Sequence, residues 1–129
     1  MAIHLGASDL VNVRQMEVAV NGPDGATHLI LCTGIANLGS VHMDTYTFLV
    51  GPRLIRRQFV GAIASAALSM IQSHDTPTME VGACLGSIDA AYDDETGQVK
   101  VQAEVLSVAN MARLAICYNV SILAEMPVF

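Results

Sequence analysis

The chain has 129 residues, which is the size of one domain, so we expect a single α+β domain over residues 1–129. Charged residues make up 14% of the chain, against about 25% in a typical soluble domain, while apolar residues make up 53%. The net charge of −6 argues against a nucleic-acid or membrane partner, because phosphates bind basic surfaces. So little charge cannot cover the whole surface of a monomer, which predicts a homo-oligomer.

The sequence also predicts a cytoplasmic protein. Residues 1–15 lack the basic start and the apolar run of a signal peptide. The longest charge-free segment, residues 58–74, falls short of the roughly 20 apolar residues that a membrane span needs. Three cysteines, Cys32, Cys84 and Cys117, cannot all pair within one chain, and each lies in apolar sequence. This pattern favours buried, reduced thiols.

The first fifty residues alternate between β-prone runs and segments rich in Gly, Asn and Pro. The run 41–50 is rich in Thr, Tyr, Phe and Val, which pack well in strands. The segment NGPDG at 21–25 favours the backbone angles of a hairpin turn. We therefore expect strands at 15–21, 27–36 and 41–50, joined by turns at 21–25 and 37–40.

The next segment predicts one long helix over residues 52–73. Pro52 suits the first helical position, because its missing N–H would be unpaired there anyway. Small, helix-forming residues fill the middle, and His74 suits the last turn because a cation is favoured near a helix C-terminus. Pro77 lies beyond the expected end.

The second half predicts three further strands. Residues 99–105 alternate Val and Ala with Lys, Gln and Glu, and residues 113–122 alternate similarly. The segment DDETGQ favours a hairpin between the first two of these strands. We expect strands at 78–92, 99–108 and 113–125, which gives the order β-β-β-α-β-β-β: a curved antiparallel sheet packed on one long central helix.

This arrangement resembles the hotdog fold, in which an antiparallel sheet wraps a long helix of small residues. The resemblance covers residues 46–125 and rests on the segment FVGAIASAALSM followed by long strands. It implies a hotdog-like acyl-thioester hydrolase or dehydratase. Hotdog thioesterases and dehydratases carry a His-Gly-Gly or His-Phe-x-Gly type motif before the helix, whereas this chain has FLVGPRLIRR there. The resemblance therefore implies the shape and not the chemistry.

Three of the six basic side chains, Arg53, Arg56 and Arg57, fall at the start of the expected helix. Cations oppose the helix dipole at that end, and a helical arrangement turns Arg56 toward the apolar side. Something should therefore compensate their charge. Three compensations stay open: carboxylates of the same chain such as Asp44, Glu80 or Asp89, carboxylates of a partner subunit, or an anionic ligand bound by arginine forks and free helix N–H groups.

Weaker candidates for chemistry lie on the third expected strand. His42 and Asp44 share one side of a strand, so the carboxylate could orient the imidazole as a general base, and Tyr46 continues that side. The alternative interpretation is a polar, solvent-facing stripe. No Cys-x-x-Cys or His-Glu-x-x-His spacing is present, so we expect neither a metal nor another cofactor.

Together these patterns favour a homo-oligomeric domain that binds a small anionic or partly apolar ligand. Arg53, Arg56, Arg57 and Tyr46 would line the site at the helix N-terminus, with His42 and Asp44 beside them. The first alternative is the hotdog-like enzyme with His42 or Asp44 as its base. The second is a structural or protein-interaction oligomer without a small ligand. The sequence favours a binding protein over an enzyme without deciding between them.

Overall fold

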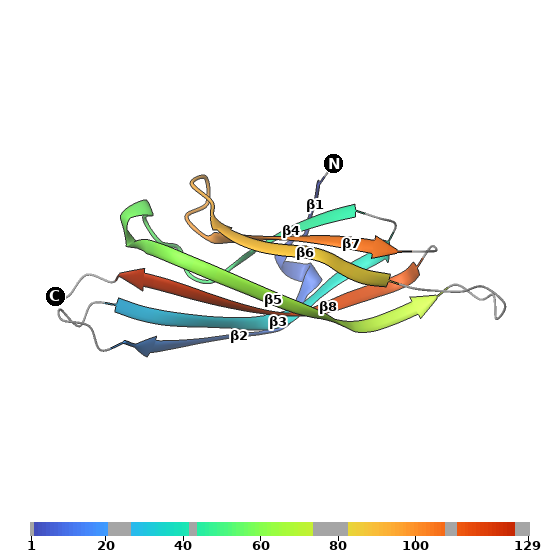
Figure 1. Ribbon diagram of the computed structural model, residues 1–129, viewed down its shortest axis with the longest axis horizontal. Coiled ribbons are helices and arrows are strands. Elements are labelled where there is room, and N and C mark those ends of the chain that lie inside the picture. Colours follow the sequence, from blue (N-terminus) through green and yellow to red (C-terminus); the bar gives the residue numbers. More distant parts are fainter. Residues whose placement is uncertain (1, 21–26, 42–43, 74–82, 108–110, 126–129) are drawn as a thin grey trace.

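The protein is a sandwich of two four-stranded β-sheets (Figure 1). The computed structural model describes residues 2–20, 27–41, 44–73, 83–107 and 111–125. Its elements are β1 (Ala2–His4), a 3-10 turn η1 (Ala7–Asp9), β2 (Leu10–Ala19), β3 (Thr27–Val41), β4 (Asp44–Val50), a 3-10 turn η2 (Arg56–Gln58), β5 (Phe59–Ser73), β6 (Ala83–Tyr92), β7 (Val99–Ser107) and β8 (Met111–Glu125).

The first sheet has the strand order β1-β4-β7-β6, and the second has the order β2-β3-β8-β5. Every neighbouring pair is antiparallel except β1 and β4, which run parallel. On one side of the sandwich, β5 of the second sheet lies next to β6 of the first. On the other side, the first sheet ends in the three-residue strand β1, and almost all of β2 is exposed.

The expected α+β fold with a central helix is wrong, because the segment predicted as a helix forms β5. Side chains alternate along this strand: Ala62, Ala64, Ala66 and Leu68 pack against the core, whereas Ile63 and Ser65 are exposed. Small inward side chains suit a strand that lies close to the neighbouring sheet. Packing and sheet pairing have therefore overridden the helix propensity of these residues. The hotdog-like shape depended on that helix and is wrong with it.

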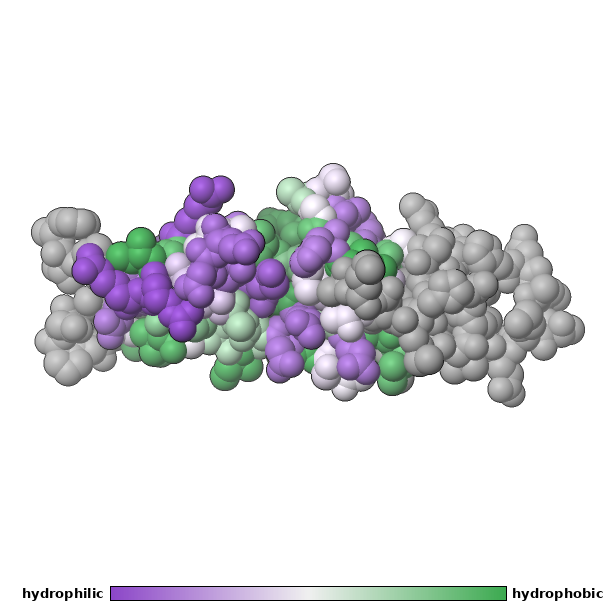
Figure 2. Space-filling view, turned by 90° about the horizontal axis from the view of Figure 1, so that it is seen from above, coloured by the Kyte–Doolittle hydropathy of each residue, from purple (hydrophilic) through white to green (hydrophobic). Residues whose placement is uncertain are grey.

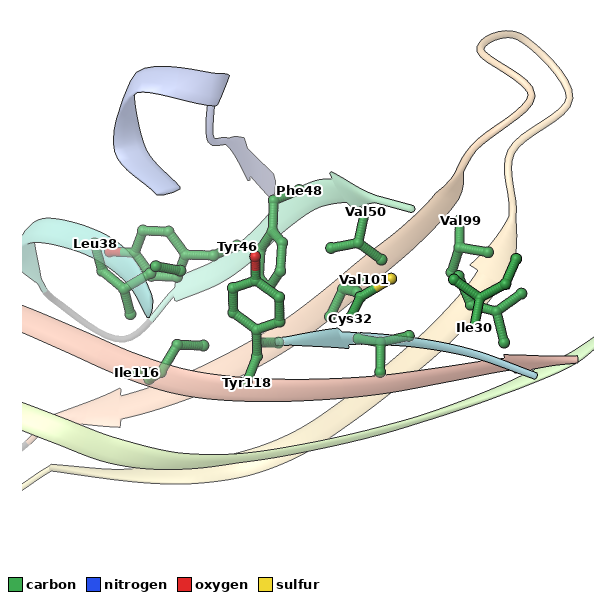
Figure 3. Close-up of a cluster of buried hydrophobic side chains, with 14 of the residues drawn as sticks. Ile30, Cys32, Leu38, Tyr46, Phe48, Val50, Val99, Val101, Ile116 and Tyr118 are labelled. Atoms are coloured by element: carbon green, nitrogen blue, oxygen red, sulfur yellow. The ribbon is translucent and has the colours of Figure 1, made fainter. Parts of the chain in front are cut away.

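The core lies between the two sheets and is built by alternate residues of the long strands. In β7, Val99, Val101, Ala103 and Val105 are buried, as their alternation with Lys100 and Gln102 predicted. Two aromatic rings meet at the centre of the core: Phe48 of the first sheet and Tyr118 of the second, whose centroids lie 4.9 Å apart (Figure 3). One hydrophobic core therefore joins both sheets.

Two expected turns had different outcomes. The hairpin at 93–98 is confirmed: Asp93 N–H donates to Gln98 O at 2.9 Å, and Gly97 supplies a φ of 74°. The turn expected at 37–40 is wrong, because β3 continues through it to Val41. Gly39 has a φ of 72°, and the register between β3 and β8 shifts on either side of it. The turn expected at 21–25 and the start of the strand expected at 78–92 lie outside the described residues.

Candidate functional site

The arginine cluster lies in the connection between β4 and β5. Arg53, Arg56 and Arg57 are all exposed, and the single 3-10 turn η2 stands where the long helix was expected. The side chain of Gln58 accepts the N–H of Ile55 at 2.9 Å, which fixes this turn. The expected site at a helix N-terminus is therefore wrong as a structure, because the dipole and the row of free N–H groups that would hold an anion are absent from residues 52–58.

Arg56 has partners within its own chain. One guanidinium nitrogen lies 3.4 Å from Asp94 Oδ1, and the guanidinium carbon lies 5.4 Å from the centre of the Tyr92 ring. Tyr92 is itself held by its hydroxyl, which donates to Leu54 O at 2.6 Å. Both members of the ion pair are more than 70% exposed, so the pair is worth only about 0–1 kcal/mol. Arg56 thus joins the connection between β4 and β5 to the 93–98 hairpin through weak surface contacts.

The other predicted site residues are not gathered at this cluster. Tyr46 is 1% exposed and packs in the core. The strand register places Tyr46 in the row of Ile88, four residues along β6 from Tyr92, or roughly 13 Å. His42 lies outside the described residues, as does the side chain of Asp44 at the start of β4. A catalytic role for these two residues stays a prediction.

A polar cavity of ≈ 270 Å³ lies beside the 93–98 hairpin, lined among others by His4, Thr47, Asp93, Thr96 and Lys100. The polar groups of this cavity bind one another. His4 Nδ1 is hydrogen-bonded to Thr47 Oγ1, and Asp93 accepts the hydroxyl of Thr96 at 2.6 Å. The Thr96 hydroxyl, with Lys100 3.6 Å away, lowers the pKa of Asp93. A lowered pKa keeps the carboxyl of Asp93 ionised. An ionised carboxylate can hold the hairpin through its hydrogen bond and ion pair, but it has no proton to donate as a general acid.

A second cavity of ≈ 240 Å³ lies beside the uncovered strand β2 and reaches Cys32 and Tyr118 of the core. Burial raises the pKa of Cys32 to about 11. Burial first, and then the neighbouring Cys32, also raises the pKa of Tyr118. Both groups are therefore neutral near pH 7, and an uncharged thiol is a poor nucleophile. Arg14 lines this second cavity, whereas Arg53, Arg56 and Arg57 line neither of the two. No set of three His, Cys, Asp or Glu side chains among the described residues is placed to hold a metal ion. No helix in the described ranges is long and apolar enough to cross a membrane.

The outer faces of the two sheets differ sharply in character. The outer face of the first sheet is polar, as expected for one solvated face of an antiparallel sheet. Figure 2 looks onto this side, and hydrophilic residues gather over its described part. The strand register assigns to this face three rows: Thr45-Glu104-Ser87, Thr47-Gln102-Asp89 and Leu49-Lys100-Ala91. Thr47 is buried beside His4, and the other polar side chains of these rows are exposed or half-buried.

The outer face of the second sheet is mainly apolar. We define it by four rows of residues that the strand register aligns across β2, β3, β8 and β5. The rows are Val18-Leu29-Leu123-Gly61, Met16-Leu31-Ser121-Ile63, Arg14-Thr33-Asn119-Ser65 and Val11-Ile35-Cys117-Ala67.

Arg14, on the edge strand, is the only charged residue in these four rows, and none of them contains a carboxylate. Ile63 and Met16, with exposed fractions of 78% and 61%, project from the face. A hollow of ≈ 470 Å³ runs beside Met16, Leu31 and Thr33.

Comparisons with protein-family models, with curated proteins and with solved structures found no match to this chain. The fold therefore defines the protein only as an antiparallel β-sandwich, and the function must be argued from its surfaces.

Sequence reasoning missed the apolar outer face, although a signal for it was present. The strand LILCTGIA of β3 is a continuous apolar run, whereas VKVQAEV of β7 alternates with charged and amide residues. Continuous runs are typical of strands that are covered on both faces. Cys117, predicted to be buried, is exposed in row four of this face, and Cys32 is buried as expected. The side chain of Cys84 lies outside the described residues.

Proposed function

We propose that this protein is a structural or interaction module that self-associates through the outer face of the second sheet. The observation that carries the proposal is the contrast between the two outer faces. One presents Lys100, Glu104 and Asp89 to solvent, and the other presents Ile63 and Met16 among neutral residues. An apolar face of this kind is stabilised when a partner covers it.

The size of the face suits a subunit contact. Four strands about 4.8 Å apart and about eight residues long cover roughly 500 Å² in projection, and side chains enlarge the accessible area. Large patches on monomers reach about 300–600 Å², and standard interfaces bury about 800 Å² on each partner. The projected area therefore lies within the range of large patches on monomers and below one side of a standard interface, so a contact through this face alone would be a small one.

The distribution of charge permits a second copy as the partner on this face. Each chain carries a net charge of −6, so two copies repel each other unless their carboxylates are kept apart. Asp89 and Glu104 lie on the opposite face of the sandwich, and Asp93 and Asp94 lie in the hairpin of the first sheet. Glu125 lies on the outer side of β8, at the end of the strand next to the Leu123 row. Contact through the second sheet would bring together the two surfaces that carry no carboxylate in their four rows.

A cytoplasmic location belongs to the same proposal. Cys117 is unpaired and exposed on the proposed contact face, and Cys32 is unpaired in the core. Exposed free thiols persist in reducing compartments.

The mass in solution tests the self-association. Light scattering coupled to gel filtration should give a multiple of 13.6 kDa for the wild type at ~10 μM. Ile63→Glu should give the monomer mass, because it places a charge at the most exposed apolar position of the contact face. Gln102→Glu is the matched control: it adds the same charge to the exposed outer side of β7 and should leave the oligomer intact. A monomeric wild type, or an Ile63→Glu variant that remains oligomeric, would refute the proposal.

A further inference from the structure

The second cavity, of ≈ 240 Å³, opens at the edge of the sandwich between β2 and β4. Strand β1 pairs with β4 only at residues 45–47, so the remainder of β4 has no described strand beside it on this edge. The chain then passes through η1 to β2 of the other sheet, and Ala7 of η1 also lines the cavity. The short first strand therefore leaves an opening into the space between the sheets.

The inner part of this cavity is apolar and uncharged. Leu10 and Val13 of β2 and Val50 of β4 form its walls, and Cys32 and Tyr118 are the core residues that it reaches. Burial raises the pKa of both the thiol and the phenol, so neither carries a charge near pH 7. A charged group would lose its hydration here without gaining a partner, so the part of a ligand that lies inside must be uncharged.

One buried polar group in this cavity lacks a partner. Tyr118 is 98% buried, yet no hydrogen bond joins its hydroxyl to another residue of the described ranges. Figure 3 shows this hydroxyl pointing from β8 toward the first sheet, and its oxygen is the Tyr118 atom nearest to the space over Gly34. Buried polar groups nearly always have a partner. The hydroxyl is therefore available to an oxygen of a bound molecule.

A second unpaired group lies at the mouth of the cavity. The register of β2 shifts between Val11 and Arg14, and Asn12 has a φ of 53°, so the strand bulges beside the opening. Arg14 lines the cavity, is exposed, and forms no ion pair or hydrogen bond within the described ranges. None of the residues that line the cavity is a carboxylate, whereas the side chain of Gln98 is already bound to Gly51 O at 2.8 Å. The mouth therefore favours an anion.

We propose that the second cavity binds a small carboxylic acid that has a single-ring apolar body and an oxygen at the end away from the carboxylate. Arg14 donates to the carboxylate at the mouth, as guanidinium groups do in paired hydrogen bonds. Tyr118 donates to the inner oxygen, and the ring lies among Leu10, Val13 and Val50. An apolar cavity of about 150 Å³ holds benzene, so ≈ 240 Å³ has room for a ring with two polar substituents. The site does not depend on self-association of the chain.

An NMR titration of the ¹⁵N-labelled protein with 4-hydroxybenzoate tests the site. Its matched probe is 4-hydroxybenzyl alcohol, which has the same ring and hydroxyl but no charge. Ligands of about ten non-hydrogen atoms bind with a Kd of roughly 0.1–10 mM. We expect saturable shifts of the Val13 and Gly51 amide signals with the acid, and binding of the alcohol about tenfold weaker.

Three variants assign the contacts. Arg14→Met should weaken binding of the acid about tenfold, because it removes a charge-assisted hydrogen bond. Lys100→Met is the control: it removes the same charge from the other cavity and should leave the Kd unchanged. Tyr118→Phe should weaken binding about two- to tenfold. It should not lower the urea midpoint of the free protein, because the hydroxyl that it removes has no partner there; a purely structural role would lower the midpoint and leave the Kd unchanged.

Four results would overturn the proposal. They are the absence of saturable shifts up to about 20 mM acid, equal binding of the alcohol, a Kd that Arg14→Met or Tyr118→Phe leaves unchanged, and a loss of binding in Lys100→Met. Arg14 also borders the proposed contact face, so light scattering checks that its substitution preserves the mass. If the mass changes, Tyr118→Phe and the uncharged probe decide, since Tyr118 lies in the core and not on that face.

Discussion

Tyr118 occupies the space that a side chain at Gly34 would need, so Gly34→Ala should destabilise the core. Gly34 on β3 lies opposite Tyr118 on β8, and the tyrosine side chain covers the glycine. A Cβ added at Gly34 would lie 2.7 Å from Tyr118 Cζ and 2.9 Å from Cε2. Tyr118 is 2% exposed and packs against Phe48, so a shift of its ring away from residue 34 would disturb this aromatic contact.

Two effects of Gly34→Ala oppose each other. Alanine restricts the unfolded chain, which stabilises by about 0.4–1 kcal/mol where the backbone conformation is compatible. Overpacking of a full core costs about 1–3 kcal/mol. The collision involves several ring atoms, so overpacking wins, and we expect a net loss of about 1–2 kcal/mol in the free energy of unfolding.

A double-mutant cycle separates the collision from any general effect of the substitution. Urea unfolding is measured at one protein concentration for the wild type, Gly34→Ala, Tyr118→Leu and the double variant. Leucine does not reach over Gly34, so Gly34→Ala should be neutral or stabilising by up to about 1 kcal/mol in the Tyr118→Leu background. Equal costs in both backgrounds, or a neutral Gly34→Ala in the wild type, would show that the ring does not restrict residue 34.

Three further predictions concern the hairpin and the thiols. The pKa of Asp93 is lowered from its ordinary value of 3.8, so its ionised form stabilises the fold above pH 3.8, and this contribution is lost as the pH falls below that value. In Asp93→Asn, the free energy of unfolding measured with urea should therefore fall less steeply between pH 6 and pH 3 than in the wild type; an equally steep fall would contradict this. Gly97→Ala should cost about 1–2 kcal/mol in thermal or urea unfolding, because Gly97 has a φ of 74° and an added Cβ would lie 3.0 Å from Leu54 O; an unchanged midpoint would contradict this. In a Cys84→Ser, Cys117→Ser background, Cys32 should resist a thiol reagent at pH 8 until the protein unfolds, since burial raises its pKa to about 11; labelling of the folded protein would refute this.

The strands could be predicted where one face is polar and the turns are local. The alternation of Val99, Val101 and Val105 with charged and amide residues identified β7, and the DDETGQ segment identified the hairpin. Both signals lie within a few residues of sequence. The short strand β1 was missed, because its three residues acquire their conformation by pairing with β4, more than forty residues away.

The helix prediction failed because residues 58–73 satisfy two local patterns at once. Their alanines favour a helix intrinsically, but Ala62, Ala64 and Ala66 also alternate with Ile63 and Ser65. The choice depends on β6 and β8, which supply a neighbouring sheet and a hydrogen-bonding partner. A surface helix normally carries charged residues on its polar side, and this segment has only Gln and Ser there. It was therefore a poor candidate for a surface helix.

The arginine cluster was predicted from a conflict with the dipole of that helix, and the conflict disappears with the helix. The carboxylate beside Arg56 is Asp94 of the hairpin, whereas Asp89 lies on the outer face of the first sheet; Glu80 and the side chain of Asp44 lie outside the described residues. No local pattern could select Asp94, because it is thirty-eight positions away in sequence. A ligand role for Arg53 and Arg57 stays a prediction.

The change from helix to strand also changes the face on which Ile63 lies. On a helix, Ile63 would share the buried side with Ala62 and Ala66. On a strand, neighbouring side chains point to opposite faces, so Ala62 packs in the core and Ile63 projects outward with 78% exposure. An isoleucine gains about 1.5–3 kcal/mol on full burial, and within its own chain Ile63 gains little of this. The residue that was expected in the core is therefore the most exposed apolar residue of the proposed contact face, where only another molecule can bury it.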